Sequence, residues 1–593
     1  MDSETQHDPL KLPALVPAAI VMLLVAAIVY LVRLGSAPLY LAPDEVIIAN
    51  DAFSLARTGR TLDGVLLPLY VFVQISGNWF MPAIYYVSAL FLKVLPLSAW
   101  AIRLPSVLIA LASMALAFAV ARKAIGDRYA ALIAILVLGC APGFFILSRY
   151  ALDYTYPVPI ILAWLYCLLT GLDRPGARGW FLAAGLLLGI GWYTYISSLV
   201  MMPVYVLISL VTMTIRKRDW RESALLLAGF VLPVTLFAIW ISQHPAAFQQ
   251  TAQRYNFVDP RETATASGLL RSFDFAAMFN RYRNFFGIEF LFELGDVYLP
   301  FSTRTTGVFV PAAGFLLGAG VFAALTRRNI SSTLILLGFL TAPLAASVLV
   351  EEGAIRRATA MLPFGALLAA LGAARIDAIA RLPLFRPVTW IGGGAALLVG
   401  LGYLSYTITT QGGRLSETAM RVAVIGVIAL AMAALAPKVR HGRLLLILNA
   451  LLILVQFTTV VRDYHGEYVS RLAPWLQGNI KGALSELMDA SRSRPEAPIY
   501  FAALRNGRGD WDIKNHFMPP YWRFYATALG REDLIAKGVF LKEDDSLDAV
   551  PKGSLVLGNL EDPHVKALVE SGSTRLIDIP EVDHPAFFTL LVK

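Results

Sequence analysis

Long apolar segments, repeated along most of the chain, constrain its fold more than any other feature. Each is close to the ~20 residues that a helix needs to cross a bilayer. They lack the alternation of barrel strands, and a backbone in lipid must satisfy its own hydrogen bonds, so helices are predicted. Only 15% of the residues are charged, against about 25% in soluble proteins. The expected spans are 14–33, 101–121, 130–147, 155–171, 180–195, 198–215, 223–241, 308–326, 332–350, 356–374, 388–409, 420–436 and 443–461.

Basic residues give the expected orientation of these spans. The net charge is +9, but the basic residues form short clusters between apolar segments, which is typical of cytoplasmic loops. The charge therefore reports topology and predicts no nucleic-acid partner. The clusters are Arg122, Lys123 and Arg128; Arg174 and Arg178; Arg216, Lys217, Arg218 and Arg221; Arg327 and Arg328; Arg375, Arg381 and Arg386; and Lys438, Arg440 and Arg443.

The segment from Met81 to Leu95 decides between two arrangements. It is short, has Pro82 at its start and Pro96 just after its end, and contains Lys93. These features suit a helix at the membrane surface. If it stays on the outer surface, every strong basic cluster faces the cytoplasm. If it crosses, the later clusters move outside. We therefore expect thirteen spans, with the N-terminus inside and the C-terminus outside.

The predicted fold class is an all-α polytopic membrane protein followed by a small α/β domain. The membrane part covers 1–461, with outer loops at 34–100 and 242–307. Residues 462–593 are rich in charge, with Pro/Gly breaks and short β-rich runs, and are expected to form the α/β domain outside the membrane. We expect a multi-pass protein of a bacterial inner membrane, with this domain and the active site facing the periplasm.

Two neighbouring acids, Asp44 and Glu45, follow the first apolar segment. Apolar residues recur after them at helical spacing until Thr58-Gly59, which predicts an amphipathic helix on the membrane surface. The acids have two interpretations. Asp44 could cap the helix while Glu45 favours its dipole. Alternatively, a carboxylate is fixed at the mouth of a membrane cavity.

Another acid, Asp153, lies in the short polar turn 148–154 between two expected spans. It could pair with Arg149 at the interface. An ionisable group at the edge of a helix bundle is also a functional candidate.

A third charged segment contains Arg356 and Arg357, preceded by Glu351 and Glu352. In the expected topology it faces outward, against the charge bias. The arginines could extend toward the interface from a helix end, or clamp a phosphate, whose oxygens suit guanidinium groups. Three segments distant in sequence thus put acids and arginines on one membrane face, which is the layout of a site.

These motifs, in this order, resemble those of the GT-C glycosyltransferases, in particular the family 39 type, which groups protein O-mannosyltransferases with the lipid A aminoarabinose transferase. In that family an acid pair follows the first membrane helix, and a later helix begins near Arg-Leu-Pro. The similarity spans roughly 14–380. The residues that carry it are Pro43-Asp44-Glu45, Arg103-Leu104-Pro105, Pro142, Ser148, Arg149, Asp153, Phe290-Leu291-Phe292, Gly295-Asp296, Arg304, Gly307, Arg356, Arg357 and Pro363.

The resemblance implies a thirteen-helix enzyme that moves a sugar from a polyprenyl-phosphate carrier to an acceptor on the outer face. Asp44, Glu45 and Asp153 are the catalytic candidates, and Asp44 resembles the family's base. The carrier phosphate would meet arginines. No metal ligand is assigned, although some relatives use a divalent ion. The acceptor stays open among lipid A, polysaccharide, another glycolipid and protein. The candidate phosphate-binding residues are Arg356, Arg357, Arg149 and Arg103.

One departure from the family pattern bears on the donor. The aminoarabinose transferase has Glu-Lys-Pro where this chain has Phe80-Met81-Pro82. A lysine for the carrier phosphate is therefore missing, which argues against aminoarabinose and moves the phosphate role to arginines.

Two other functions stay open at this point. A transporter or flippase of lipid-linked sugars would place polar groups near the bilayer midplane, whereas the acids here lie at helix ends. A non-catalytic envelope scaffold would not need Asp44 for its activity.

Overall fold

The computed structural model describes most of the chain. Everything below refers to the described residues, which are 15–75, 77–174, 176–254, 275–327, 329–348, 353–376, 378, 398, 443–476, 479–502, 512–542, 545–559, 562–572, 574–579 and 588–593.

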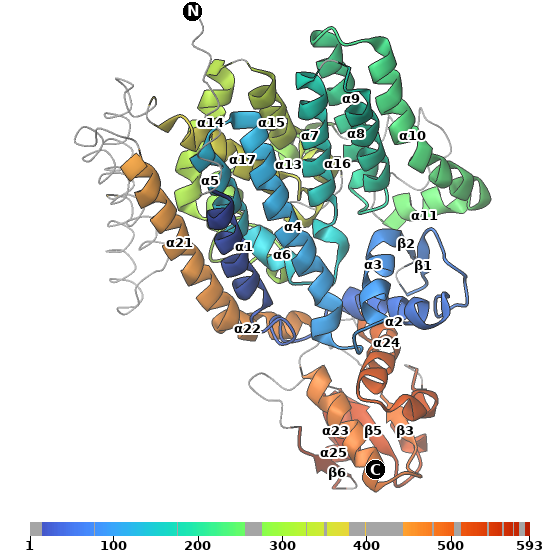
Figure 1. Cartoon of the computed structure of the whole chain (residues 1–593). Coiled ribbons are helices and arrows are strands. Elements are labelled where there is room, and N and C mark those ends of the chain that lie inside the picture. The colour runs from blue at the N-terminus through green and yellow to red at the C-terminus, as the bar shows by residue number, and fades with distance from the viewer. Residues whose placement is uncertain are drawn as a thin grey trace, which may run out of the picture.

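Apolar helices form a bundle that makes up most of the molecule (Figure 1). Within the described residues, six stretches are long and apolar enough to cross a membrane. A seventh results if the bent pair α5 (Arg128–Gly139) and α6 (Pro142–Ser148), which meet at 59°, is one span. The six stretches are α4 (Ala99–Ile125), η2 with α7 (Asp153–Thr155, Pro157–Asp173), α9 (Ser198–Ile215), α10 (Trp220–Gln243), α15 with α16 (Ile330–Thr341, Leu344–Val348) and α21 (Arg443–His465). Shorter apolar helices are α1 (Leu15–Leu31), α8 (Arg178–Gly191), α14 (Pro311–Arg327) and α17 (Met361–Ala373).

Small residues allow close contact between these helices. A Cβ atom on Gly185 of α8 would lie 2.0 Å from the carbonyl oxygen of Leu226 on α10. A Cβ on Gly229 of α10 would lie 2.4 Å from the carbonyl oxygen of Leu182. The two backbones touch where lipid supplies no hydrophobic force between helices, so packing holds the pair together.

Short elements build a layer at one end of the bundle (Figure 1). These are α2 (Pro43–Thr58), the antiparallel hairpin β1 (Val71–Val73) and β2 (Asn78–Phe80), and α3 (Pro82–Leu92). Between α10 and α14 lie α11 (Ala246–Arg254), α13 (Phe275–Asn284), the π-helical turn η3 (Glu289–Glu293) and η4 (Leu299–Phe301). A single turn, η5 (Ile355–Arg357), precedes α17.

The residues after α21 form a five-stranded mixed sheet with helices beside it, at the same end as α2 (Figure 1). Its strand order is β4-β3-β5-β7-β6. Strand β3 is parallel to β4 and β5, whereas β7 is antiparallel to β5 and β6. The elements are α22 (Glu467–Leu472), η6 (Ala473–Leu476), α23 (Ile480–Ser493), β3 (Ile499–Phe501), α24 (Asp512–Ala528), η7 (Glu532–Lys537), β4 (Gly538–Phe540), η8 (Leu547–Ala549), β5 (Leu555–Gly558), α25 (Pro563–Glu570), β6 (Arg575–Ile577) and β7 (Thr589–Val592).

The mostly helical membrane fold expected from the sequence is confirmed in its coarse form. Two expected spans, 388–409 and 420–436, lie outside the described residues apart from residue 398. The other expected spans each coincide with an apolar helix or a bent or broken pair. The segment from Met81 to Leu95 forms α3, whose 11 residues measure about 16 Å, against ~30 Å for the hydrocarbon core. That it does not cross stays a prediction.

Candidate active site

A fully buried ion pair fixes the start of α2. Glu45 and Arg103 of α4 are both 0% exposed. The guanidinium donates from Nε to Glu45 Oε1 (2.8 Å) and from Nη2 to Oε2 (2.9 Å). Its other donors bond the carbonyl oxygens of Leu34 (3.2 Å), Pro38 (2.8 Å) and Tyr40 (3.0 Å). All five N–H donors of the arginine are thus used.

Glu45 is equally occupied. Its Oε2 accepts from the backbone N–H of Ala42 (2.9 Å), the N-cap residue of α2, which is the glutamate half of a capping box. Its Oε1 accepts from the backbone N–H of Ala151 (2.8 Å). One carboxylate therefore joins the loop before α2, helix α4 and the turn that precedes Asp153.

Arg149 makes similar contacts at the end of α1. Its guanidinium donates to the carbonyl oxygens of Tyr30, Val32 (2.8 Å) and Ala37 (2.9 Å) at the end of α1. It also lies over the ring of Tyr464, 5.3 Å from its centroid. An Arg149–Asp153 pair, one of the two alternatives for this turn, is not among the ion pairs of the described residues. The guanidinium instead satisfies helix-end carbonyls that lack partners.

Asp44 stands beside this framework, in the first turn of α2, and is half-buried. It interacts electrostatically with Asp153, Tyr154, Tyr85 and Tyr521. These residues come from η2, α3 and α24. Elements far apart in the sequence therefore meet around the Asp44 carboxylate.

Asp153 lies in η2, which contacts the turn η5 that carries Arg356 and Arg357. It is 8% exposed and interacts electrostatically with Arg357 as well as with Asp44. The turns that carry them, η2 and η5, are in contact. The structure thus brings together Asp44, Asp153 and Arg357, as the sequence motifs suggested, although they come from three distant segments.

Arg356 is held next to this group by a buried acid. Asp296 is 0% exposed, and its Oδ1 lies 3.6 Å from Nη1 of Arg356. Its Oδ2 accepts from the backbone N–H of Ile355 (2.9 Å). The guanidinium also lies over the rings of Tyr298 and Phe301, at 5.0 and 4.8 Å. The turn η5 is therefore fixed with its two arginines at the site. Glu351 and Glu352 lie outside the described residues.

Two residues of this region were given no role in the sequence prediction. Asp296 belongs to a segment that resembles the family, but the sequence predicts no function for it. Tyr85 sits among apolar residues of α3, so no sequence signal marked it. Its side chain is fully buried, and burial raises the pKa of its hydroxyl well above the usual range, so it stays a hydrogen-bond donor. That hydroxyl has no hydrogen-bond partner among the described residues and interacts with Asp44 and Asp153.

A metal site is not evident in the described part of the chain. No group of three His, Cys, Asp or Glu side chains there is placed to hold an ion. The charged groups of the site are the carboxylates of Asp44, Asp153 and Asp296 and the guanidinium groups of Arg356 and Arg357. They suit a proton transfer beside a phosphate anion.

Comparisons with known proteins give the class of this fold. Residues 81–242 match the family described as dolichyl-phosphate-mannose-protein mannosyltransferase. The chain is similar to the crystal structure of ArnT from Cupriavidus metallidurans bound to undecaprenyl phosphate, with a TM-score of 0.53, 16% identity, and 97% of this chain and 98% of that chain covered. The apo structure of the same ArnT gives a TM-score of 0.55 at 15% identity, with the same coverage. No curated protein sequence matches this chain significantly.

The resemblance predicted from the sequence is therefore confirmed. The chain shares its fold with ArnT, and residues 81–242 match the protein mannosyltransferase family model.

Proposed function

We propose that this protein is a membrane glycosyltransferase that moves a sugar from a polyprenyl-phosphate carrier to an acceptor on the outer face of a bacterial inner membrane. The observation that carries the proposal is the meeting of Asp44 and Asp153 with the arginines of η5. Undecaprenyl phosphate bound to the similar ArnT supports a carrier of this class. The acceptor is a glycolipid, a polysaccharide or a protein.

Asp44 acts as the general base. An acceptor hydroxyl has a pKa far above neutrality, so a base must take its proton as the oxygen attacks the anomeric carbon. The new bond joins that oxygen to the anomeric carbon, and the bond from the anomeric carbon to the carrier phosphate breaks. The phosphate leaves with the bonding electron pair. Asp153, beside Asp44, positions the acceptor hydroxyl.

Arg356 and Arg357 receive the departing phosphate. Guanidinium groups match phosphate oxygens, and a site with little water makes their attraction stronger than in bulk water. Asp296 and the rings around Arg356 fix one of the two guanidinium groups before the donor binds. The two arginines thereby take the role of the phosphate-binding lysine that the aminoarabinose transferase has at the position of Met81.

We assign Glu45, Arg103 and Arg149 to positioning rather than to contact with the substrate. Their hydrogen bonds to Ala42, Ala151 and several loop carbonyls fix the segments that carry Asp44 and Asp153. This differs from the expectation that Glu45 is catalytic and that Arg103 and Arg149 meet the carrier phosphate.

The transporter alternative has less support. Its polar groups would lie near the middle of the spans. Asp44, Asp153, Arg356 and Arg357 instead lie at helix starts and in single turns. The scaffold alternative does not account for the buried Asp296, which holds the arginines of η5 at the proposed site.

A deletion strain tests the function. Mass spectrometry of its envelope glycolipids and proteins should show a species that has lost the mass of one sugar. Wild-type protein should restore that species, and the Asp44→Asn variant should not. Unchanged envelope masses after deletion, or full restoration by Asp44→Asn, would contradict the proposal.

A further inference from the structure

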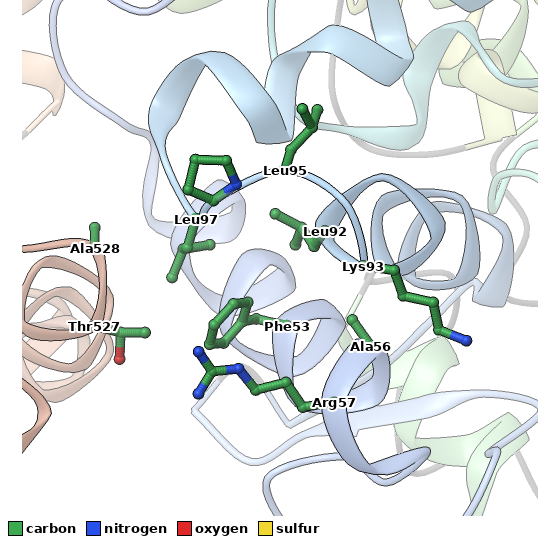
Figure 2. Close-up of a pocket in the computed structure, with 10 residues that line it drawn as sticks. Phe53, Ala56, Arg57, Leu92, Lys93, Leu95, Leu97, Thr527 and Ala528 are labelled. Carbon is green, nitrogen blue, oxygen red and sulfur yellow. The ribbon is translucent and has the colours of Figure 1, made fainter. Parts of the chain in front are cut away.

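A pocket lies at the other end of α2 from Asp44. It has a volume of about 350 Å³ and is formed by α2, by the end of α3 with the loop that follows, and by the end of α24. Figure 2 shows Phe53 and Leu92 between these segments, with Arg57 and Lys93 at the rim. Phe53 is nine residues after Asp44, or about 13 Å along the helix axis.

Two cations flank the pocket. Arg57 is 59% exposed, lies over the ring of Phe53 at 4.2 Å and pairs with Glu532 at 3.3 Å. The ammonium group of Lys93 has no ion pair or hydrogen bond with any described residue. The Arg57–Glu532 pair is exposed on both sides, so a competing anion displaces it readily.

Beside the two cations and Thr527, the pocket has an apolar wall. Phe53, Leu92, Leu95 and Ala528 line it. In the loop that follows α3, Val94 is 81% exposed. An apolar helix end with a flanking lysine is typical of the interface between lipid tails and headgroups.

We propose that this pocket binds the headgroup of an anionic lipid of the outer leaflet. Its phosphate lies between Arg57 and Lys93, and the first carbons of its tails contact Phe53, Leu92 and Leu95. Charge complementarity selects an anion, and the apolar walls select an amphiphile over a free ion. This lipid site is separate from the proposed transfer site, and it does not depend on the transfer chemistry.

The test is lipid binding to the full-length purified protein. Phosphatidylglycerol is titrated in mixed micelles and the bound lipid is counted by native mass spectrometry, with phosphatidylcholine and inorganic phosphate as comparison ligands. Lys93→Gln and Arg57→Gln should each weaken phosphatidylglycerol binding about tenfold. Glu532→Gln should strengthen it, because it frees Arg57. Ala528→Trp should abolish it by filling the pocket while keeping both cations.

The matched control is Lys566→Gln, which removes an exposed lysine of α25 and should change nothing. Unaltered binding in the Lys93→Gln or Glu532→Gln variants would overturn the proposal. So would equal affinity for phosphatidylcholine, which would indicate a layer of unspecific lipid. Complete displacement by millimolar inorganic phosphate would show a site for free anions instead.

Discussion

At the scale of single residues, buried charge decides what each acid of α2 can do. Glu45 is neutralised by Arg103 and accepts four hydrogen bonds, so it has no capacity left for a substrate. Asp44, one residue earlier, remains half-buried beside Asp153. Glu45 therefore bonds the start of the helix, and the role of base is proposed for Asp44. The sequence could not separate them, because the partner of Glu45 lies 58 residues away.

Removing Arg103 should destabilise the protein strongly. Arg103→Met leaves Glu45 buried without its partner, a loss typically of about 3–5 kcal/mol. Arg103→Lys should also fail to rescue, because three donors cannot replace five. Thermal unfolding followed by intrinsic fluorescence measures this. The control Arg178→Gln removes an exposed pair with Asp219, which is worth about 0–1 kcal/mol; equal shifts in both variants would contradict the assignment.

Asp51 of α2 predicts a pH dependence of stability. Burial raises the pKa of this carboxyl from 3.8 to about 6, although its Oδ1 accepts from the backbone N–H of Leu62. The folded state holds this proton more tightly than the unfolded state does. The contribution of Asp51 to stability is therefore fully present below the unfolded-state pKa of 3.8 and is lost as the pH rises through the folded-state pKa of about 6. Asp51→Asn removes this loss and keeps an acceptor. The variant should have a higher unfolding temperature than wild type at pH 7.5 and a smaller advantage at pH 4.5; an advantage that grows toward acid pH would contradict it.

At the scale of elements, the sequence predicted helices well and contacts poorly. Apolar length alone indicated the spans, since lipid leaves the backbone few alternatives. The motifs of α2, η2 and η5 pointed to one face, because positive-inside bias orders the loops. The docking of α24 on α2 had no local signal. Asn50 donates to the carbonyl oxygen of Pro520 (2.9 Å), a contact between residues 470 positions apart.

The contact between α24 and α2 predicts a remote effect on turnover. The hydroxyl of Tyr521 donates to the carbonyl oxygen of Leu41, just before the turn that carries Asp44. Tyr521→Phe should lower kcat about threefold to tenfold, with the unfolding temperature nearly unchanged, since it loosens the position of the base. Tyr500→Phe on β3 is the control. A change in KM alone, with kcat preserved, would show that α24 does not position Asp44.

At the scale of the whole molecule, one end of the bundle carries α2, α3 and the five-stranded sheet (Figure 1). The chain leaves α21 and returns through α24 to the helix that carries Asp44. The proposed site therefore draws on the loop and helix after α1, the turn before α7, the turn before α17 and the C-terminal part.

Because these parts form one site, they must share one side of the membrane. We expect 242–307 and everything after Val461 to be extracytoplasmic, which also puts every strong basic cluster inside. Paired reporters fused after Val461 measure this: a periplasm-dependent phosphatase should be active there, and a cytoplasm-dependent one inactive. The reverse pattern would overturn the topology and the proposed outer-face site together.

The role of Asp44 is the central claim, and one assay addresses it directly. Purified wild-type and Asp44→Asn proteins receive the polyprenyl-phosphate sugars extracted from the producing cells, with envelope lipids and proteins as acceptors. Release of free carrier phosphate is the readout, and carrier binding is measured in parallel. Asparagine keeps the shape of the side chain, so the variant should stay folded and bind the carrier, while turnover falls about 10²–10⁴-fold. Turnover at the wild-type rate would contradict the account.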